Sequence, residues 1–136
     1  MSETKPKILI AEDEFLPATH LRTMLGRAGH EIVGPVSTAR ECVEEARLAK
    51  PDLILLDIRL AGETDGIDAA REIRSFDKDV DIIFMSGYQE SALRERAMAQ
   101  GPLAFLVKPV LLKDIQSIMD RPRKPAELPP RDITAS

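Results

Sequence analysis

The chain has 136 residues, of which 43% are hydrophobic and 31% charged, a composition that fits one globular domain with a hydrophobic core. The formal net charge of −4 argues against a large nucleic-acid-binding surface, which would need an excess of basic residues. No apolar stretch approaches the length of a membrane span, and no signal-peptide core precedes the first apolar run. We therefore expect a cytoplasmic protein that binds neither nucleic acid nor membrane.

Short apolar runs alternate with helix-period patterns five times along the chain, which indicates an α/β fold with a parallel sheet. The run at 53–56 is apolar without alternation, as expected of a central strand covered on both faces. In the first half, we expect strands at 7–11, 31–36 and 53–56, with helices at 15–28 and from the Ser37-Thr38 pair to Lys50. In the second half, we expect strands at 81–86 and 103–107, with helices at 67–75, 89–100 and 111–120.

Local signals mark several of these boundaries. Gly29 is predicted to end the first helix, and Thr38 with Glu41 has the spacing of a capping box at the start of the second. Residues 62–66 are predicted to form a loop. Cys42 shares helical spacing with apolar neighbours, so we expect it to be a small buried residue. Because it is the only cysteine, no intramolecular disulfide is possible.

The last residues, 121–136, differ in character from the rest of the chain. They hold four prolines, several charges and few large apolar residues. Proline lacks an amide donor and blocks the continuation of a helix. We therefore expect a folded domain at 1–120 and a flexible, proline-rich C-terminal tail at 121–136.

Four of the apolar runs are followed or closed by polar side chains at their C-terminal ends. Glu12 and Asp13 follow the first run, Asp57 the third, Ser86 the fourth and Lys108 the fifth. In an open parallel sheet these ends share one edge, where ligand crevices form. Clustered carboxylates without a nearby histidine or cysteine suit Mg²⁺, and a hydroxyl and an ammonium beside such a cation can contact phosphoryl oxygens. The pattern predicts a phosphoryl-transfer site in which one of the acids is the nucleophile.

In their order and spacing, these residues resemble the receiver domain of two-component response regulators. The resemblance covers about residues 6–120 and depends on all five elements together, because each alone is a weak signal. It implies a flavodoxin-like, doubly wound sheet of five parallel strands in the order 2-1-3-4-5, flanked by five helices. It also implies a bacterial signalling switch rather than an enzyme.

The resemblance gives a role to each acidic residue of the site. Asp57 would be the phosphoacceptor, receiving a phosphoryl group from a sensor histidine kinase or a histidine phosphotransfer protein. Mg²⁺ would be bound directly by Asp13 and Asp57, by Glu12 mainly through water, and by the backbone carbonyl of Arg59.

The resemblance also implies how the phosphoryl group is sensed. Ser86 would hydrogen-bond the acyl phosphate, and Lys108 would form an ion pair with it. Movement of Ser86 toward the phosphate would let Phe105 turn inward, which shifts the population between two conformations; a static core role for Phe105 is an equal alternative. The output would pass to an unidentified downstream protein or along a phosphorelay, from a monomer or a phosphorylation-dependent homodimer.

Two features depart from the commonest receiver pattern. The segment after Asp57 is about one residue longer and lacks the Met-Pro pair that many receivers carry. Residues 84–88 (Phe-Met-Ser-Gly-Tyr) resemble, one position shorter, the Phe-Ala-Thr-Gly-x-Tyr signature of a subgroup linked to stand-alone, single-domain regulators.

Two other functions are compatible with parts of the pattern. A small phosphohydrolase of the haloacid-dehalogenase type would also use an aspartyl nucleophile, but it would need an acid where this chain has Arg59. A degenerate receiver used only for protein binding would be expected to lack some of the site residues, and this chain has all of them.

Overall fold

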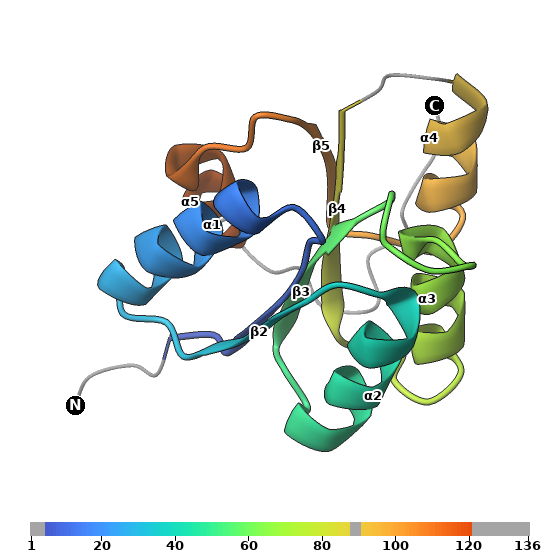
Figure 1. Ribbon diagram of the computed structural model, residues 1–136, viewed down its shortest axis with the longest axis horizontal. Coiled ribbons are helices and arrows are strands. Elements are labelled where there is room, and N and C mark those ends of the chain that lie inside the picture. Colours follow the sequence, from blue (N-terminus) through green and yellow to red (C-terminus); the bar gives the residue numbers. More distant parts are fainter. Residues whose placement is uncertain (1–4, 88–90, 121–136) are drawn as a thin grey trace.

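The computed structural model describes residues 5–87 and 91–120, which form five strands and five helices in alternating order (Figure 1). The strands are β1 (Ile8–Ala11), β2 (Ile32–Val36), β3 (Leu53–Asp57), β4 (Asp81–Ser86) and β5 (Ala104–Val107). The helices are α1 (Phe15–Arg27), α2 (Ala39–Ala49), α3 (Gly66–Arg74), α4 (Ser91–Met98) and α5 (Leu112–Met119). The strands pair in parallel in the order β2-β1-β3-β4-β5, which confirms the predicted flavodoxin-like α/β fold.

Helices cover both faces of the sheet, with α1 and α5 on one side and α2, α3 and α4 on the other (Figure 1). Successive strand residues point to opposite faces and therefore enter two separate hydrophobic clusters. In β3, Ile54 and Leu56 pack toward α2 and α3, whereas Leu53 and Leu55 pack toward α1 and α5. Burial on both faces explains why this strand is apolar at every position before its last residue.

The predicted boundaries of the first two helices are close to those observed. Gly29 follows the end of α1 with a φ of +101°, a conformation that favours glycine. At the start of α2, Thr38 Oγ1 accepts a hydrogen bond of 3.0 Å from the Glu41 backbone N–H. A full capping box would also have the Glu41 carboxylate accept from the backbone N–H of Thr38. This part of the prediction is wrong, because the Glu41 carboxylate accepts from the backbone N–H of Ser37.

The prediction that Gly66 belongs to a loop is also wrong, because α3 begins at this residue. Asp65 caps the helix: its Oδ1 accepts from the Asp68 backbone N–H at 2.9 Å, and its own N–H donates to Asp68 Oδ2 at 3.0 Å. This reciprocal pair satisfies two backbone N–H groups at the helix start. The helix therefore starts one residue earlier than the hydrophobic pattern indicated.

The fourth helix is the least embedded of the five. Its predicted range of 89–100 is observed as Ser91–Met98, and in it Ala97 is the buried residue. Residues 88–90 and the predicted tail at 121–136 lie outside the described residues. Among the helices in the described part of the chain, none has the length and apolar character needed to cross a membrane.

Candidate functional site

The strand order brings the C-terminal ends of β1 and β3 side by side, with Ala11 paired with Leu56. The chain leaves β1 toward β2 on one side and enters β3 on the other, and this change of direction is where doubly wound sheets form ligand crevices. Glu12 and Asp13 follow β1, and Asp57 is the last residue of β3. Oxygen atoms of these three carboxylates lie within 4.8 Å of one another, so the fold assembles the acidic cluster expected from the sequence.

Lys108 provides the positive charge inside this cluster. Its Nζ donates to Glu12 Oε1 at 2.7 Å and to Asp57 Oδ2 at 2.6 Å. The side chains of Glu12 and Asp57 are 0% and 5% exposed, whereas Asp13 is exposed. The backbone N–H of Arg59 donates to Asp57 Oδ1 at 3.0 Å, so both oxygens of Asp57 accept a hydrogen bond.

Burial and charge act in opposite directions on the ionisable groups. Burial raises the pKa of Glu12, an effect that the hydrogen bond from Lys108 opposes and the nearby Asp57 adds to. For Lys108, burial alone would lower the pKa, but the hydrogen bonds and charges of Asp57 and Glu12 outweigh it and the pKa is raised. The lysine is therefore held as an ammonium between Glu12 and Asp57. Asp13 adds a third acidic group to a cluster that could hold a metal ion.

The donor atoms indicate which kind of cation this site suits. Within residues 5–87 and 91–120, Glu12, Asp13 and Asp57 form the group of side chains that can hold a metal ion, and all of its donors are carboxylate oxygens. Hard cations such as Mg²⁺ and Ca²⁺ prefer oxygen ligands, whereas zinc and copper sites draw on nitrogen and sulfur. Because Asp13 is exposed, water or phosphate oxygens could also reach a cation held by these acids.

A cleft of about 420 Å³ opens beside the cluster and gives access to Asp57. It is lined by Asp13, Glu14, Asp57, Arg59, Leu60, Gly87 and Lys108. Gly87 has no side chain to fill this space, and a Cβ added there would meet nothing within 4 Å. The cleft is therefore open enough to admit a small anionic group next to the Asp57 carboxylate.

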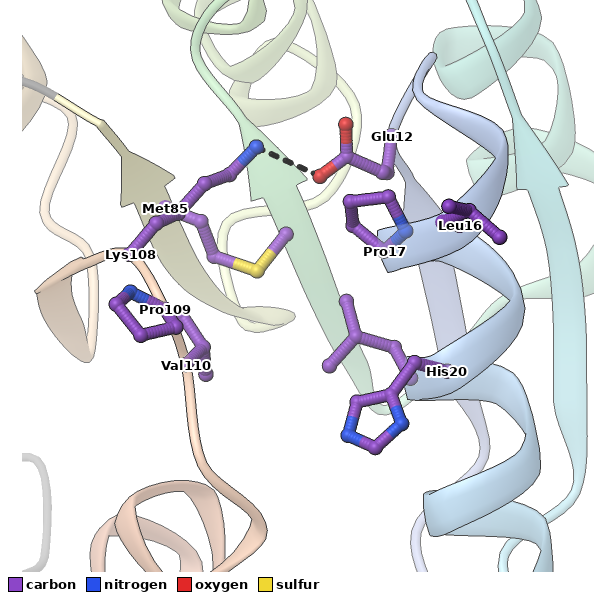
Figure 2. Close-up of a pocket in the computed structure, with 9 residues that line it drawn as sticks. Glu12, Leu16, Pro17, His20, Met85, Lys108, Pro109 and Val110 are labelled. Carbon is purple, nitrogen blue, oxygen red and sulfur yellow. Dashed lines mark hydrogen bonds and ion pairs between the residues drawn. The ribbon is translucent and has the colours of Figure 1, made fainter.

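A second, more apolar pocket of about 510 Å³ lies against Glu12 and Lys108 (Figure 2). Figure 2 shows Pro17 and His20 of α1 facing Pro109 and Val110 across it, and Leu16 also lines the pocket. The sequence pattern did not indicate this pocket. A signal for it in the sequence is the apolar Phe15-Leu16-Pro17 run, which is separated from the Glu12-Asp13 pair by one residue. In the structure Phe15 and Leu16 are 78% and 75% exposed.

The two residues expected to sense a phosphoryl group lie on adjacent strands. Ser86 is buried at the end of β4, and its backbone oxygen accepts from the backbone N–H of Lys108 at 2.7 Å. Phe105 is partly buried in β5, opposite Phe84. The guanidinium carbon of Arg94 in α4 lies 5.1 Å from the centroid of the Phe105 ring, a cation–π contact that the sequence did not indicate.

The doubly wound fold and the acidic cluster with its lysine define a receiver-type signalling domain. The family model of the response regulator receiver domain matches residues 8–120, and the chain belongs to this family. Receiver domains take phosphoryl groups from histidine kinases, so family membership favours the signalling prediction over the phosphohydrolase alternative.

Known relatives agree with this assignment. The transcriptional regulatory protein PdtaR of Mycobacterium tuberculosis is 42% identical over 109 residues, which are 80% of this chain and 52% of PdtaR. The chemotaxis protein CheY of Thermotoga maritima is 34% identical over 76% of this chain and 85% of CheY. The solved receiver domain of a modulated diguanylate cyclase from Desulfovibrio desulfuricans has a TM-score of 0.77 and 32% identity, covering 84% of this chain and 90% of that one. The chain thus spans about half the length of PdtaR.

Proposed function

We propose that this chain is a phosphorylation switch in which Asp57 accepts a phosphoryl group from a phosphohistidine on a sensor kinase or a phosphotransfer protein. In this step a carboxylate oxygen of Asp57 forms a bond to phosphorus. The P–N bond to the donor imidazole breaks, and its electron pair leaves with the imidazole nitrogen. The observation that carries the proposal is the nearly buried Asp57 carboxylate, which is hydrogen-bonded to Lys108 and faces an open cleft beside two further acids.

The acidic cluster is proposed to hold Mg²⁺ during transfer. Asp13 and Asp57 would be direct ligands together with the backbone carbonyl of Arg59. Glu12 would act mainly through water, because its side chain is buried and already bound to Lys108. When bound, Mg²⁺ would supply positive charge that offsets the negative charge of the phosphoryl oxygens.

The phosphoryl group is proposed to be sensed by Lys108 and Ser86. Lys108 already contacts the carboxylate that would carry the phosphoryl group, so a small rearrangement would pair its ammonium with a phosphoryl oxygen. The hydroxyl of Ser86 would donate to another oxygen. Phe105 would then turn from its place beneath Arg94 toward the interior, which changes the surface that α4 and β5 offer to a downstream protein.

Phosphorylation by a small donor tests this function directly. Acetyl phosphate with Mg²⁺ is expected to add one phosphoryl group to the wild-type protein, detected by intact-mass spectrometry. Asp57→Asn is expected to gain none, because an amide is not a nucleophile of comparable strength. Chelation of Mg²⁺ should slow the wild-type reaction strongly, whereas Asp77→Asn, which changes an acid outside the site, should leave it unchanged.

Two results would contradict the proposal. One is an unchanged mass of the wild-type protein at saturating donor and Mg²⁺. The other is equal labelling of the wild type and Asp57→Asn, which would place the phosphoryl group on another residue.

The oligomeric state is a separate part of the proposal. The exposed charges of α4 and α5, including Arg94 and Lys113, offer pairing partners for a second copy. Light scattering after size exclusion, with and without beryllofluoride as a phosphoryl mimic, tests this part. A mass that doubles with beryllofluoride would support a phosphorylation-dependent homodimer. An unchanged monomer mass would limit the output to a different protein.

A further inference from the structure

The first turn of α3 lies directly against the backbone of Asp57. Gly66, the first residue of α3, is buried, and its N–H donates to the carbonyl oxygen of Ile58 at 2.7 Å. A Cβ added at Gly66 would overlap the carbonyl oxygen of Asp57. It would also lie 3.0 Å from the Asp57 carbonyl carbon and 3.0 Å from Ile58 Cα. The glycine therefore allows a contact between helix and strand backbones that no other residue permits.

Space, and not backbone conformation, is what requires glycine at this position. The glycines of the described chain with positive φ are Gly29, Gly34, Gly62 and Gly101, and Gly66 is not among them. At a helical position alanine is intrinsically preferred over glycine by about 0.5–1 kcal/mol. The cost of a side chain at Gly66 would thus arise from its overlap with the residue that carries the proposed phosphoacceptor carboxylate.

Neither side of this contact can move freely to relieve the overlap. On the side of α3, Ile67 and Ile73 are fully buried and Asp65 caps the helix. On the side of the strand, Asp57 pairs with Met85 in β4. Because the colliding atoms include backbone atoms, rotation of a side chain cannot separate them, and the backbone of Asp57 must take up part of the displacement.

The Asp57 carboxylate has little tolerance for displacement. Asp57 Oδ2 lies 2.6 Å from Lys108 Nζ, and Oδ1 lies 3.0 Å from the backbone nitrogen of Arg59. One carboxylate oxygen from each of Glu12, Asp13 and Asp57 lies within 4.8 Å of the others. Misplacement of a reacting group by about 1 Å costs on the order of 10²-fold in rate. A backbone shift at Asp57 would therefore be expected to slow phosphoryl transfer even in a domain that stays folded.

We propose that Gly66 is a positioning residue for phosphoryl transfer: by having no side chain, it lets α3 hold the Asp57 backbone at the depth that Lys108 and the acidic cluster require. The inference rests on the proposed role of Asp57 as phosphoacceptor. It concerns a residue that contacts the backbone of Asp57 and takes no part in the chemistry.

The test compares Gly66→Ala with Gly26→Ala, a matched change in α1 where a Cβ meets nothing within 4 Å. The rate of labelling by acetyl phosphate is measured by intact-mass spectrometry over a range of Mg²⁺ concentrations. Gly66→Ala is expected to lower the rate at saturating donor by about 100-fold and to raise the Mg²⁺ concentration for half-maximal rate. Gly26→Ala should stay within about twofold of the wild type in both measures.

Repeating the rates in trimethylamine N-oxide separates positioning from stability. This osmolyte favours the folded state of a weakened variant but cannot remove an atomic overlap. Gly66→Ala that is folded by circular dichroism and still slow would support the proposal. Recovery of the wild-type rate in the osmolyte, an unchanged Mg²⁺ dependence, or failure to fold even there would overturn it by assigning Gly66 to folding alone. If the wild type itself is not labelled, the proposed function of Asp57 fails instead.

Discussion

Lys108 and Glu12 are 96 residues apart in the sequence and are joined by an ion pair of 2.7 Å between Nζ and Oε1. The same ammonium binds Asp57, so one cation serves two carboxylates that are almost completely removed from solvent. A buried carboxylate without a partner is strongly unfavourable. Lys108 therefore also stabilises the fold, and the effect of removing it on the free energy of unfolding should be measurable without any phosphorylation assay.

Lys108→Met is expected to lower the free energy of unfolding in Mg²⁺-free buffer by about 2 kcal/mol, because it leaves two buried carboxylates without their cation. Adding Mg²⁺ should restore more stability to this variant than to the wild type, since a cation that binds the folded state compensates for the lost charge. Urea denaturation with and without Mg²⁺ measures both effects. Lys113→Met, which removes an exposed lysine of α5, is the control, and equal losses in the two variants would contradict the prediction.

Asp13→Asn is expected to weaken Mg²⁺ binding on the order of tenfold while changing stability little, because Asp13 belongs to the acidic cluster but is exposed to solvent. Glu14→Gln is the matched control: Glu14 is also exposed and lines the same cleft, but it is not a member of the cluster. Calorimetric titration of Mg²⁺ compares the variants. A similar loss of affinity in both would mean that general negative charge, and not direct ligation, attracts the metal.

The parts of the site that follow strands were predictable from the sequence, whereas contacts made across the sheet were not. Asp57 could be located because an apolar run ends at it and parallel strands align their ends. The partner of Lys108 depends on three-dimensional distances, so the sequence indicated a phosphate contact but not the pair with Glu12. The predicted start of α3 is one residue late because Gly66 resembles a loop residue, although the Asp65–Asp68 spacing carries the capping pattern.

Arg94→Gln is expected to loosen the ring of Phe105, because the guanidinium carbon that lies 5.1 Å from the ring centroid is removed. In protein labelled with fluorophenylalanine, the fluorine resonance assigned to Phe105 should move in this variant part of the way toward its position in beryllofluoride-treated wild type. Arg22→Gln in α1 is the control, since this exposed arginine lies on the other side of the sheet. A Phe105 resonance that responds to neither the substitution nor beryllofluoride would identify Phe105 as a static core residue.

Cys42 gives the folded state a measurable sensitivity to alkaline pH. Its side chain is fully buried in α2, and burial raises the pKa of the thiol from 9.0 to about 12. Between these two values the unfolded chain has lost a proton that the folded chain keeps, so raising the pH favours unfolding. One proton corresponds to about 1.4 kcal/mol per pH unit.

Above pH 9 the free energy of unfolding of the wild type should therefore fall more steeply than that of Cys42→Ala, by about 1.4 kcal/mol per pH unit. Urea denaturation of both proteins across this range compares the slopes, which are unaffected by the constant cost of the smaller side chain. Parallel slopes, or rapid reaction of the native protein with a thiol reagent, would mean that solvent reaches Cys42 in the folded state.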